Sequence, residues 1–390
     1  MIETLDTNSI IIGAGPAGLA VAARLRREGI AFEILERSAE GVGSAWRHHY
    51  DRLHLHTDKD HSALPFVAWP DSAPRYPSRE QVVDYFADYA RRFDLEPRLG
   101  QNVVAVARHD DGWRVRTEQG LRVRGQNVVV CTGYNGIPHE PTFPGQEDFK
   151  GPIVHSSRYK NGAPHRGQRV LVIGFGNSGG EIAIDLHEHG ARPCMAVRHA
   201  VNIIPKEVLG QPILATSIKM SFLPVWLADL IARPLQRIYI GDITKLGLRQ
   251  LPYGPNRQIL KDGRIPLLDI GTVRLLREGH ITAYPGIERF TVDGVVFEDG
   301  RREPFDAVVM ATGFRPRVDR FVRDARSVLD EEGTPTKSGQ PTDLPGLYFC
   351  GFWVSPTGMI REIAIESKRI AAAIVAAAAA PAPAGAGAGA

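Results

Sequence analysis

The sequence predicts an α/β fold made of two Rossmann-like dinucleotide-binding domains, the second inserted into the first. Three observations support this fold class. A Gly-x-Gly-x-x-Gly motif occurs twice, each time after an apolar strand and before a helix. The second strand of each unit ends on a charged residue, and two further β-branched strands end in Thr-Gly. The length of 390 residues also exceeds that of most single domains.

Composition excludes some classes of protein. The chain is 43% hydrophobic and 23% charged, and its net charge of +3 is too small to indicate a nucleic-acid partner. The cysteines at 131, 194 and 350 form no CxxC pair, which argues against a disulfide framework or a redox cysteine pair. No metal site is expected. Isolated thiols, and a strand expected within about eight residues of the N-terminus with no signal peptide before it, favour a cytoplasmic location.

The first nucleotide unit consists of a strand at 8–12, a glycine motif and a helix through Arg27. The motif is formed by Gly13, Gly15, Pro16, Ala17 and Gly18. The first glycine makes the turn, the second lets a pyrophosphate approach the backbone, and the third lets the helix pack on the strand. Free N–H groups at the helix N-terminus would bind the phosphates.

An acidic residue indicates which dinucleotide this unit binds. The strand at 32–35 leads to Glu36 and Arg37, about 20 residues after the glycines. Glu36 is placed to accept both ribose hydroxyls of an adenosine, as FAD or NAD requires. We assign FAD to this unit, with Glu36 and Arg37 among its binding residues.

The second unit repeats this scheme with a strand at 169–173 and a helix through about His189. Its motif is formed by Gly174, Gly176, Asn177, Ser178 and Gly179. The second strand of this unit ends on Arg198 and His199, and Arg198 would suit the 2′-phosphate that distinguishes NADPH from NADH. The alternative is that Arg198 is only a solvated strand end. We assign NADPH to this unit.

Two similar segments mark where the chain crosses between the domains. One strand ends in Thr132 and Gly133 and the other in Thr312 and Gly313, small residues that would let the chain pass close to a nucleotide. The FAD domain is therefore expected to be split. The expected divisions are an FAD domain at 1–165 and 300–378, an NADPH domain at 166–299 with a helical insertion at about 213–250, and a disordered Ala/Pro/Gly-rich tail at 379–390.

The most apolar stretch, 213–240, carries charged residues and prolines that oppose a membrane span. We interpret it as an amphipathic helix that covers a pocket. Weak attachment to a membrane surface is the alternative. Formation of a homodimer stays open, because nothing in the sequence signals it.

With these motifs, the chain resembles the flavin-containing monooxygenases, and most closely their YUCCA-type members. The family signature FxGxxxHxxx(Y/F) is present as Phe149, Gly151, His155 and Tyr159. YUCCA-like runs occur at 50–56, 151–155, 176–179, 267–271 and 311–314, and the resemblance covers about residues 8 to 372. Gly180 is a departure, since YUCCA-type sequences usually carry Met there.

The resemblance implies an enzyme in which NADPH reduces FAD and the reduced flavin captures O2 as a C4a-hydroperoxide. Bound NADP⁺ would protect this intermediate while a small organic substrate receives one oxygen atom. His155 would lie between the domains and couple them structurally.

The resemblance also implies roles for single residues near the flavin. Asn135 would face the flavin–nicotinamide junction as a catalytic amide, unless it only shapes the turn before Gly136. His56 stands where animal members carry an Asn that supports the intermediate, and is the second catalytic candidate. Trp46, Thr57 and Val104 are the remaining residues expected in the flavin site.

Three functions are compatible with this sequence. The first is oxidative decarboxylation of an aryl 2-oxo acid such as indole-3-pyruvate, which needs a cation for the carboxylate; Lys206, Arg249 and Arg264 are candidates. The second is N- or S-oxygenation of a small soft nucleophile. The third is a flavin reductase that does not oxygenate, which the isolated cysteines disfavour.

Overall fold

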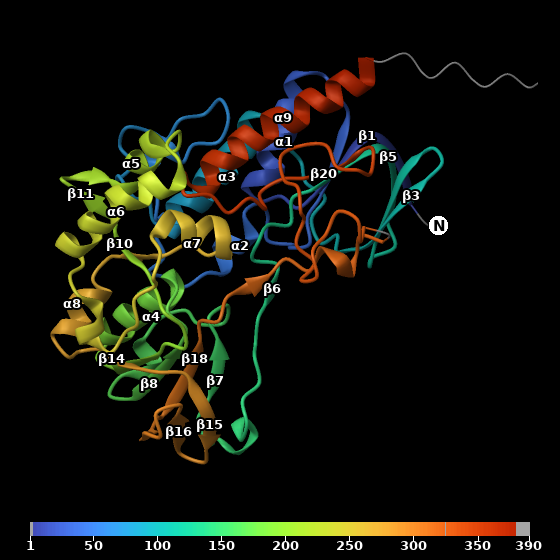
Figure 1. The fold of residues 1–390 in the computed structure, drawn as a ribbon. Helices are drawn as coiled ribbons and strands as arrows, with labels where there is room; N and C mark the ends of the chain where they lie inside the picture. The colour runs from blue at the N-terminus through green and yellow to red at the C-terminus, as the bar shows by residue number, and fades with distance from the viewer. Residues whose placement is uncertain (1–2, 324, 380–390) are drawn as a thin grey trace, which may run out of the picture.

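The computed structural model describes residues 3–323 and 325–379. Figure 1 shows two sheet-centred parts joined by extended segments, with a helical region beside the second part. The predicted tail lies outside the described residues, apart from Ala379. No helix in the described ranges is long and apolar enough to cross a bilayer.

The first sheet has the strand order β2-β1-β5-β4-β3, with β20 also paired to β5. Its parallel strands are β1 (Thr4–Ile12), β2 (Phe32–Leu35), β5 (Arg122–Val130) and β20 (Leu347–Phe349). The strands β3 (Val103–His109) and β4 (Gly112–Thr117) add an antiparallel hairpin. This arrangement confirms the first predicted Rossmann-like unit, with its last strand contributed by the C-terminal segment.

Alternate residues of these strands face two separate cores, as expected for a sheet covered on both faces. Ile11 and Val129 pack with α1 (Pro16–Arg27), α3 (Arg79–Arg92) and α9 (Met359–Ala379). Figure 1 shows α1, α3 and α9 together on this face. The neighbouring residues of the same strands pack against the β3–β4 hairpin and against Val318, Val322, Ala325 and Val328.

The second sheet is parallel throughout, in the order β14-β9-β8-β18-β7. Its strands are β7 (Ile153–His155), β8 (Arg169–Ile173), β9 (Arg192–Ala196), β14 (Thr282–Tyr284) and β18 (Ala307–Met310). One face is covered by α4 (Asn177–Glu188) and α8 (Thr272–Arg277). The other face packs on a small sheet of β15 (Ile287–Thr291), β16 (Gly294–Phe297) and β17 (Arg302–Pro304).

The sheets divide the chain at different places from the predicted boundaries. We expected 1–165 and 300–378 to form one domain, yet β7 and β18 both belong to the second sheet, where they are hydrogen-bonded to each other. The two Thr-Gly strands look alike because each lies beside the glycine loop of its own sheet: Cys131 N–H donates to Ile12, and Ala311 N–H to Ile173.

The chain crosses between the two sheets along a two-stranded ribbon. The outgoing segment β6 (Ile137–Pro138) pairs antiparallel with the returning segment β19 (Phe314–Arg315). Figure 1 shows β6 in the gap between the two parts. This pairing ties the end of β5 to the end of β18 and so fixes the glycine loops relative to each other.

The predicted insertion forms a helical layer. It contains α5 (Ile213–Met220), α6 (Val225–Tyr239) and α7 (Pro255–Asp262), with a hairpin of β11 (Glu207–Val208) and β12 (Gln211–Pro212) before them. The paired strands β10 (Ile203–Pro205) and β13 (Leu267–Asp269) close the layer at its base. The layer continues beyond the predicted limit of about 250, because α7 packs on α6 through Asp229, which caps its first turn.

Candidate active site

The first glycine loop has the geometry that a dinucleotide requires. Gly13 has a φ of +105°, and a Cβ at that residue would lie 2.6 Å from the carbonyl oxygen of Cys131. A Cβ on Gly18 would lie 1.9 Å from the oxygen of Gly13, so the helix can approach its strand only with glycine there. Around Gly15, by contrast, nothing lies within 4 Å of a Cβ. That open space, at the N-terminus of α1, fits an approaching pyrophosphate, and we call this site the first cradle.

The second loop repeats the same three features. Gly174 has a φ of +112°, with the carbonyl oxygen of Ala311 2.4 Å from a Cβ position. A Cβ on Gly179 would lie 2.5 Å from the carbonyl oxygen of Gly174, whereas nothing lies within 4 Å of a Cβ on Gly176. The N-terminus of α4 therefore offers a second cradle of the same shape.

Glu36 anchors the first loop. Its carboxylate accepts hydrogen bonds from the N–H of Ala14 at 2.7 Å and from the N–H of Ser38 at 2.9 Å. It is buried at the end of β2 and lies on the cavity wall described below. Carboxylate oxygens have lone pairs beyond these two bonds, so the side chain can still accept ribose hydroxyls.

Cations gather at the end of β9, beside the second loop. Arg198 donates from Nε to Nε2 of His199 at 2.9 Å, and Arg249 donates to the carbonyl oxygen of Arg198. The pKa of His199 is lowered by burial first and then by the charges of Arg198, Arg264 and Arg249. Among the described residues, none of these arginines forms a salt bridge with a carboxylate. The group is thus a positive site with no carboxylate in salt-bridge contact among the described residues, and the nearby acid Glu298 opposes the lowering of the pKa of His199.

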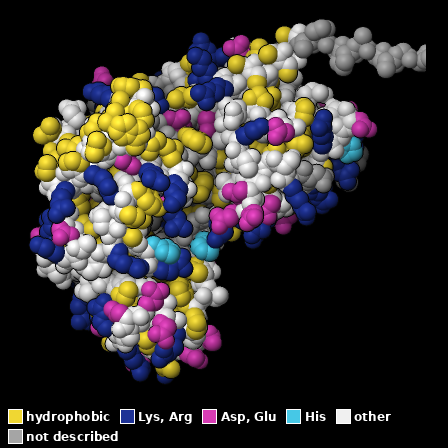
Figure 2. Space-filling model, in the orientation of Figure 1, with side chains coloured by type: hydrophobic (Ala, Val, Ile, Leu, Met, Phe, Trp, Pro, Cys, Tyr) yellow, Lys and Arg dark blue, Asp and Glu magenta, His cyan; other side chains and the backbone are white. Residues whose placement is uncertain are grey.

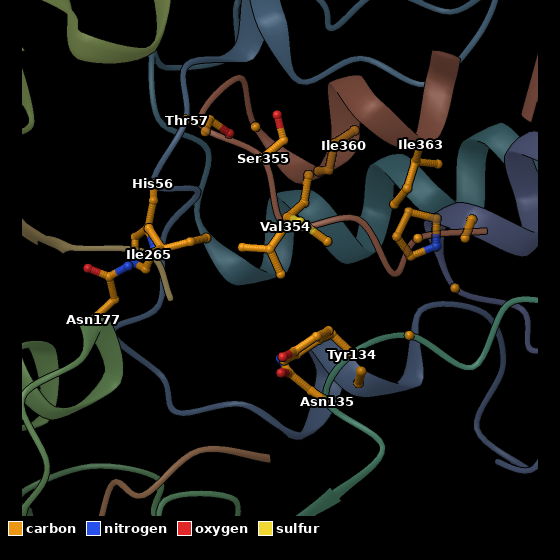
Figure 3. A pocket seen from close by; sticks show the side chains of 18 of the residues that line it. His56, Thr57, Tyr134, Asn135, Asn177, Ile265, Val354, Ser355, Ile360 and Ile363 are labelled. Carbon is orange, nitrogen blue, oxygen red and sulfur yellow. The ribbon is translucent and has the colours of Figure 1, made fainter. Parts of the chain in front are cut away.

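One cavity of about 890 Å³ extends from the first glycine loop to the second and under the helical insertion. Figure 3 shows that side chains from both parts of the chain face it, including His56 and Thr57, Asn135, and Asn177. The predicted site residues on its wall are Gly13, Gly15, Pro16, Ala17, Glu36, Arg37, Trp46, His56, Thr57, Val104, Thr132, Gly133, Asn135, Asn177 and Ser178. Its volume lies within the range of cofactor and substrate pockets.

The other predicted residues lie away from this wall. They are Gly18, Gly174, Gly176, Gly179, Arg198, His199, Thr312 and Gly313. Gly18 and Gly179 are helix-packing positions. Thr312 donates from its hydroxyl to the carbonyl oxygen of His139, and the oxygen of Gly313 contacts Nε2 of His155 at 3.0 Å. The second Thr-Gly pair therefore holds the crossing segments together.

The residues of the family signature also hold the fold together and do not line the cavity. Gly151 is close-packed, since a Cβ would lie 2.5 Å from the oxygen of Asp306. Tyr159 donates to Asp185 of α4 at 2.5 Å, and Phe149 is buried in the core beneath β15 and β16. His155 is fully buried and does not line the cavity. These residues attach the edge strand β7 to the second sheet.

A buried ionisable cluster surrounds Glu181 of α4, a residue that was not among the site residues predicted from the sequence. Glu181 contacts His56 at 2.5 Å and is 3% exposed. Burial, followed by the charge of His56, lowers the pKa of His49 to about 4, and burial also lowers the pKa of Lys206. Burial, with Glu181 next, raises the pKa of Tyr50. The sequence signal for this cluster was the acidic residue Glu181 among the apolar residues of the predicted helix.

The cysteines are not all isolated. Cys131 and Cys350 follow the paired strand ends Val130 and Phe349, so they lie side by side. The pKa of the Cys350 thiol is raised by its contact with Cys131 and by burial. All three cysteines carry free thiols. The sequence separation of 131 and 350 concealed this pair, although a raised pKa opposes the thiolate that a redox pair would need.

The fold and the two cradles define a flavin- and nicotinamide-dependent oxidoreductase. In agreement, residues 10–209 match the family model described as pyridine nucleotide-disulphide oxidoreductase. The chain is 40% identical over 359 residues to the probable indole-3-pyruvate monooxygenase YUCCA3 of Arabidopsis thaliana, covering 88% of this chain and 81% of that protein. It is 38% identical over 357 residues to the indole-3-pyruvate monooxygenase YUCCA1 of Oryza sativa subsp. japonica, covering 90% and 87%.

The fold is shared with solved structures of lower identity. A flavin-containing monooxygenase from Stenotrophomonas maltophilia has a TM-score of 0.74 at 24% identity, with 96% of this chain and 100% of that chain covered. A bacillithiol disulfide reductase from Bacillus cereus has a TM-score of 0.68 at 21% identity, with 95% and 99% covered. The sequence relatives show that the chain belongs to the YUCCA family of flavin monooxygenases. It is a monooxygenase that acts on an organic substrate with O2.

Proposed function

We propose that the chain binds FAD at the first cradle and NADPH at the second, and that it decarboxylates an aryl 2-oxo acid such as indole-3-pyruvate to the corresponding acetic acid. The observation that carries this proposal is the single cavity, which joins the first cradle to the N-terminus of α4 and continues under the apolar helices α5 and α6. Two cofactors and one substrate can therefore meet in it. We retain the predicted cytoplasmic location as part of this proposal.

The assignment of FAD rests on the extent of the first site. Besides Glu36, the cavity wall includes Val104 and Trp46. The indole ring of Trp46 packs edge-on against Phe86, which gives the wall a rigid aromatic surface. A partly apolar wall of this kind, continuous with the glycine loop, fits a dinucleotide with a flat ring system.

The assignment of NADPH rests on the cationic group at the end of β9. A 2′-phosphate would supply the negative charge that Arg198 and Arg249 lack among the described residues. NADH carries only hydroxyls at that position. We therefore expect a strong preference for NADPH.

When bound, the flavin supplies the redox chemistry and the activation of O2. The residues of this chain bind and orient the cofactors and the substrate, and they shield the reaction from water. His56 is held by Glu181 at the cavity wall, where its second ring nitrogen can donate to or accept from a bound group. The amide of Asn135 faces the cavity from the segment after β5. The helices α5 and α6 roof the cavity and limit the entry of water.

The substrate class follows from the roof and from the relatives. Apolar side chains under the roof, such as Ile213, Leu235 and Ile265, fit an aromatic ring. Both sequence relatives named above are described as indole-3-pyruvate monooxygenases. None of Lys206, Arg249 and Arg264 lines the cavity, which removes the three cations that we expected to receive the carboxylate. His56, held by Glu181, takes that place in the proposal.

The test is a product analysis with indole-3-pyruvate, a tertiary amine and a thioether side by side, under labelled O2. The proposed reaction converts one 2-oxo acid, one O2, one NADPH and one proton into the shortened acid, CO2, NADP⁺ and water. One labelled oxygen atom should appear in the acid. Oxygenation of the amine or the thioether alone would replace the proposal with N- or S-oxygenation.

A non-oxygenating reductase is the competing function from another class, since the family model is described as a disulphide oxidoreductase and two structural neighbours are bacillithiol disulfide reductases. A reductase would oxidise NADPH with a disulfide acceptor and incorporate no label. The buried Cys131 and Cys350 would then have to exchange with that acceptor. Replacing both cysteines with Ser should leave the oxygenase activity intact and would abolish such a reductase.

A further inference from the structure

Exposed apolar side chains are concentrated over the helical insertion. Of the thirteen large hydrophobic side chains that are exposed in the described part of the chain, nine lie between residues 209 and 265. Figure 2 shows hydrophobic side chains gathered over α5, α6 and the β11–β12 hairpin, with Lys and Arg beside them. We define the roof surface as Leu209, Phe222, Trp226, Leu230, Ile238 and Tyr239.

The helix α6 is apolar on two opposite sides. Trp226 and Leu230 point outward, with exposed fractions of 68% and 62%. Ala232 and Leu235 lie on the inner side and line the cavity. A helix that is apolar on both sides is normally covered on both sides. The inner side of α6 is apolar because it lines the cavity. The outer side is also apolar, but no part of the described chain covers it.

The hairpin tip adds a protruding apolar side chain. Leu209 is 87% exposed and has a φ of +51°, a backbone conformation that residues other than Gly and Asn rarely adopt. Its N–H donates to the hydroxyl of Tyr239, which ties the tip to the end of α6. A leucine held in a strained, exposed position is a candidate for function. The tip and α6 together present one apolar face.

The charges around this face are positive. Between residues 209 and 265 there are eight Lys and Arg residues against Asp229, Asp242 and Asp262. None of the eight forms a salt bridge within the described chain, although arginines elsewhere commonly do. Asp229 is buried and caps α7, so it does not offset them at the surface. Arg233 and Arg237 lie on the exposed side of α6 itself.

These charges favour an anionic partner over a second copy of the chain. A twofold interface brings the same patch of both copies together, so it would bring two positively charged patches against each other. An anionic lipid surface offers both an apolar phase for the roof surface and negative headgroups for its cations.

We propose that the roof surface docks on an anionic lipid bilayer, with Leu209, Trp226 and Leu230 inserted at the level of the headgroups. The binding is peripheral: the helices lie on the membrane. This inference stands independently of the proposed substrate, because it uses only the outer side of the insertion. The inner side, which lines the cavity, is left unchanged by the test.

The test is co-sedimentation of the full-length holoenzyme with vesicles of phosphatidylcholine alone and of phosphatidylcholine mixed with phosphatidylglycerol. We expect binding to the mixed vesicles only, weakened by salt because the cations contribute to it. Trp226→Glu combined with Leu230→Glu should lower the bound fraction by about tenfold or more. Arg233→Gln combined with Arg237→Gln should lower it on mixed vesicles and reduce its salt dependence.

Matched controls separate docking from general effects. Val292→Glu changes an exposed apolar residue on the small sheet, and Lys368→Gln with Arg369→Gln removes two exposed cations from α9. Both should bind mixed vesicles as the unchanged protein does. Flavin content and NADPH oxidation should be the same in all variants, which shows that each is folded.

Two results would overturn the proposal. One is that the unchanged protein fails to bind the mixed vesicles, or that the Trp226 and Leu230 variant binds them equally well. The other is that the unchanged protein sediments as a dimer without lipid and the same variant becomes a monomer. In that case the roof surface is an interface between copies of the chain.

Discussion

His56 and Glu181 join the two halves of the active site. Nε2 of His56, on the loop that follows α2 (Ser44–His48), lies 2.5 Å from Oε1 of Glu181 in the first turns of α4. The second carboxylate oxygen of Glu181 is buried and has no partner among the described residues. Through this contact, Glu181 of α4, the helix that begins at the second glycine loop, orients the imidazole ring of His56 at the cavity wall.

Glu181→Gln should uncouple NADPH oxidation from product formation. The amide keeps the size of the side chain but removes the charge that orients His56. We expect kcat/KM for oxygenation to fall by about tenfold, equivalent to about 1.4 kcal/mol. The ratio of product to NADPH consumed should fall with it, while H2O2 rises.

The control for this prediction is Glu188→Gln, at the end of the same helix, where the carboxylate pairs with Arg52 at the surface. That variant should keep the normal ratio of product to NADPH. Flavin content should be unchanged in both. A normal ratio in Glu181→Gln would mean that the contact only holds the domains together.

Much of the fold could be predicted because each glycine loop has a local signal. The turn at Gly13, the open space at Gly15 and the packing at Gly18 follow from residue types at fixed spacing. The order of the strands within each sheet was harder to predict. The strands at 153–155 and 307–310 pair with each other although nearly the whole second domain lies between them in the sequence, and no local pattern encodes such a contact.

The site was predictable to the same limited extent. A motif residue such as Asn177, and a residue at a strand end such as Glu36, do reach the cavity. Glu181 was missed because its partner lies 125 residues earlier in the chain. The pair Cys131 and Cys350 was missed for the same reason, since parallel strands bring distant residues into register.

Glu36→Gln should weaken flavin binding. The carboxylate accepts N–H bonds from both Ala14 and Ser38, and an amide cannot accept both with equal geometry. Loss of one hydrogen bond to a charged group corresponds to roughly ten- to hundredfold in affinity. Flavin retained after dilution, followed by its absorbance, measures the effect. Glu33→Gln, on the same strand but paired with Arg98, should retain flavin normally; loss in both would indicate a damaged strand.

Arg198→Ala should change the choice of nicotinamide cofactor. Removal of the guanidinium should lower kcat/KM for NADPH by about ten- to hundredfold, because a charged partner of the 2′-phosphate is lost. The value for NADH should change little. Arg192→Ala, at the start of β9, the strand that leads to Arg198, is the matched control and should leave the ratio of NADPH to NADH rates unchanged. An equal loss with both cofactors would place the 2′-phosphate elsewhere.

Acid should destabilise the protein through His49. Burial lowers its pKa from 6.5 to about 4, so the folded protein holds the ring neutral where the unfolded chain would protonate it. The unfolded state then binds more protons between these values, and stability falls as the pH drops from 6.5 towards 4. At about pH 5 the loss attributable to His49 is about 2 kcal/mol.

Urea unfolding of the holoenzyme, followed by tryptophan fluorescence at about pH 7.5 and about pH 5, measures this loss. Other groups also titrate in that range, so the informative quantity is the difference between the unchanged protein and His49→Gln. Gln cannot be protonated, and the variant should therefore lose about 2 kcal/mol less on acidification, whatever its stability at neutral pH. His48→Gln changes an exposed neighbour and is the matched control, which should lose as much stability on acidification as the unchanged protein does. If His49→Gln and the unchanged protein lose equal stability, His49 is protonated in the folded state, and the cavity wall beside Trp46 must admit water.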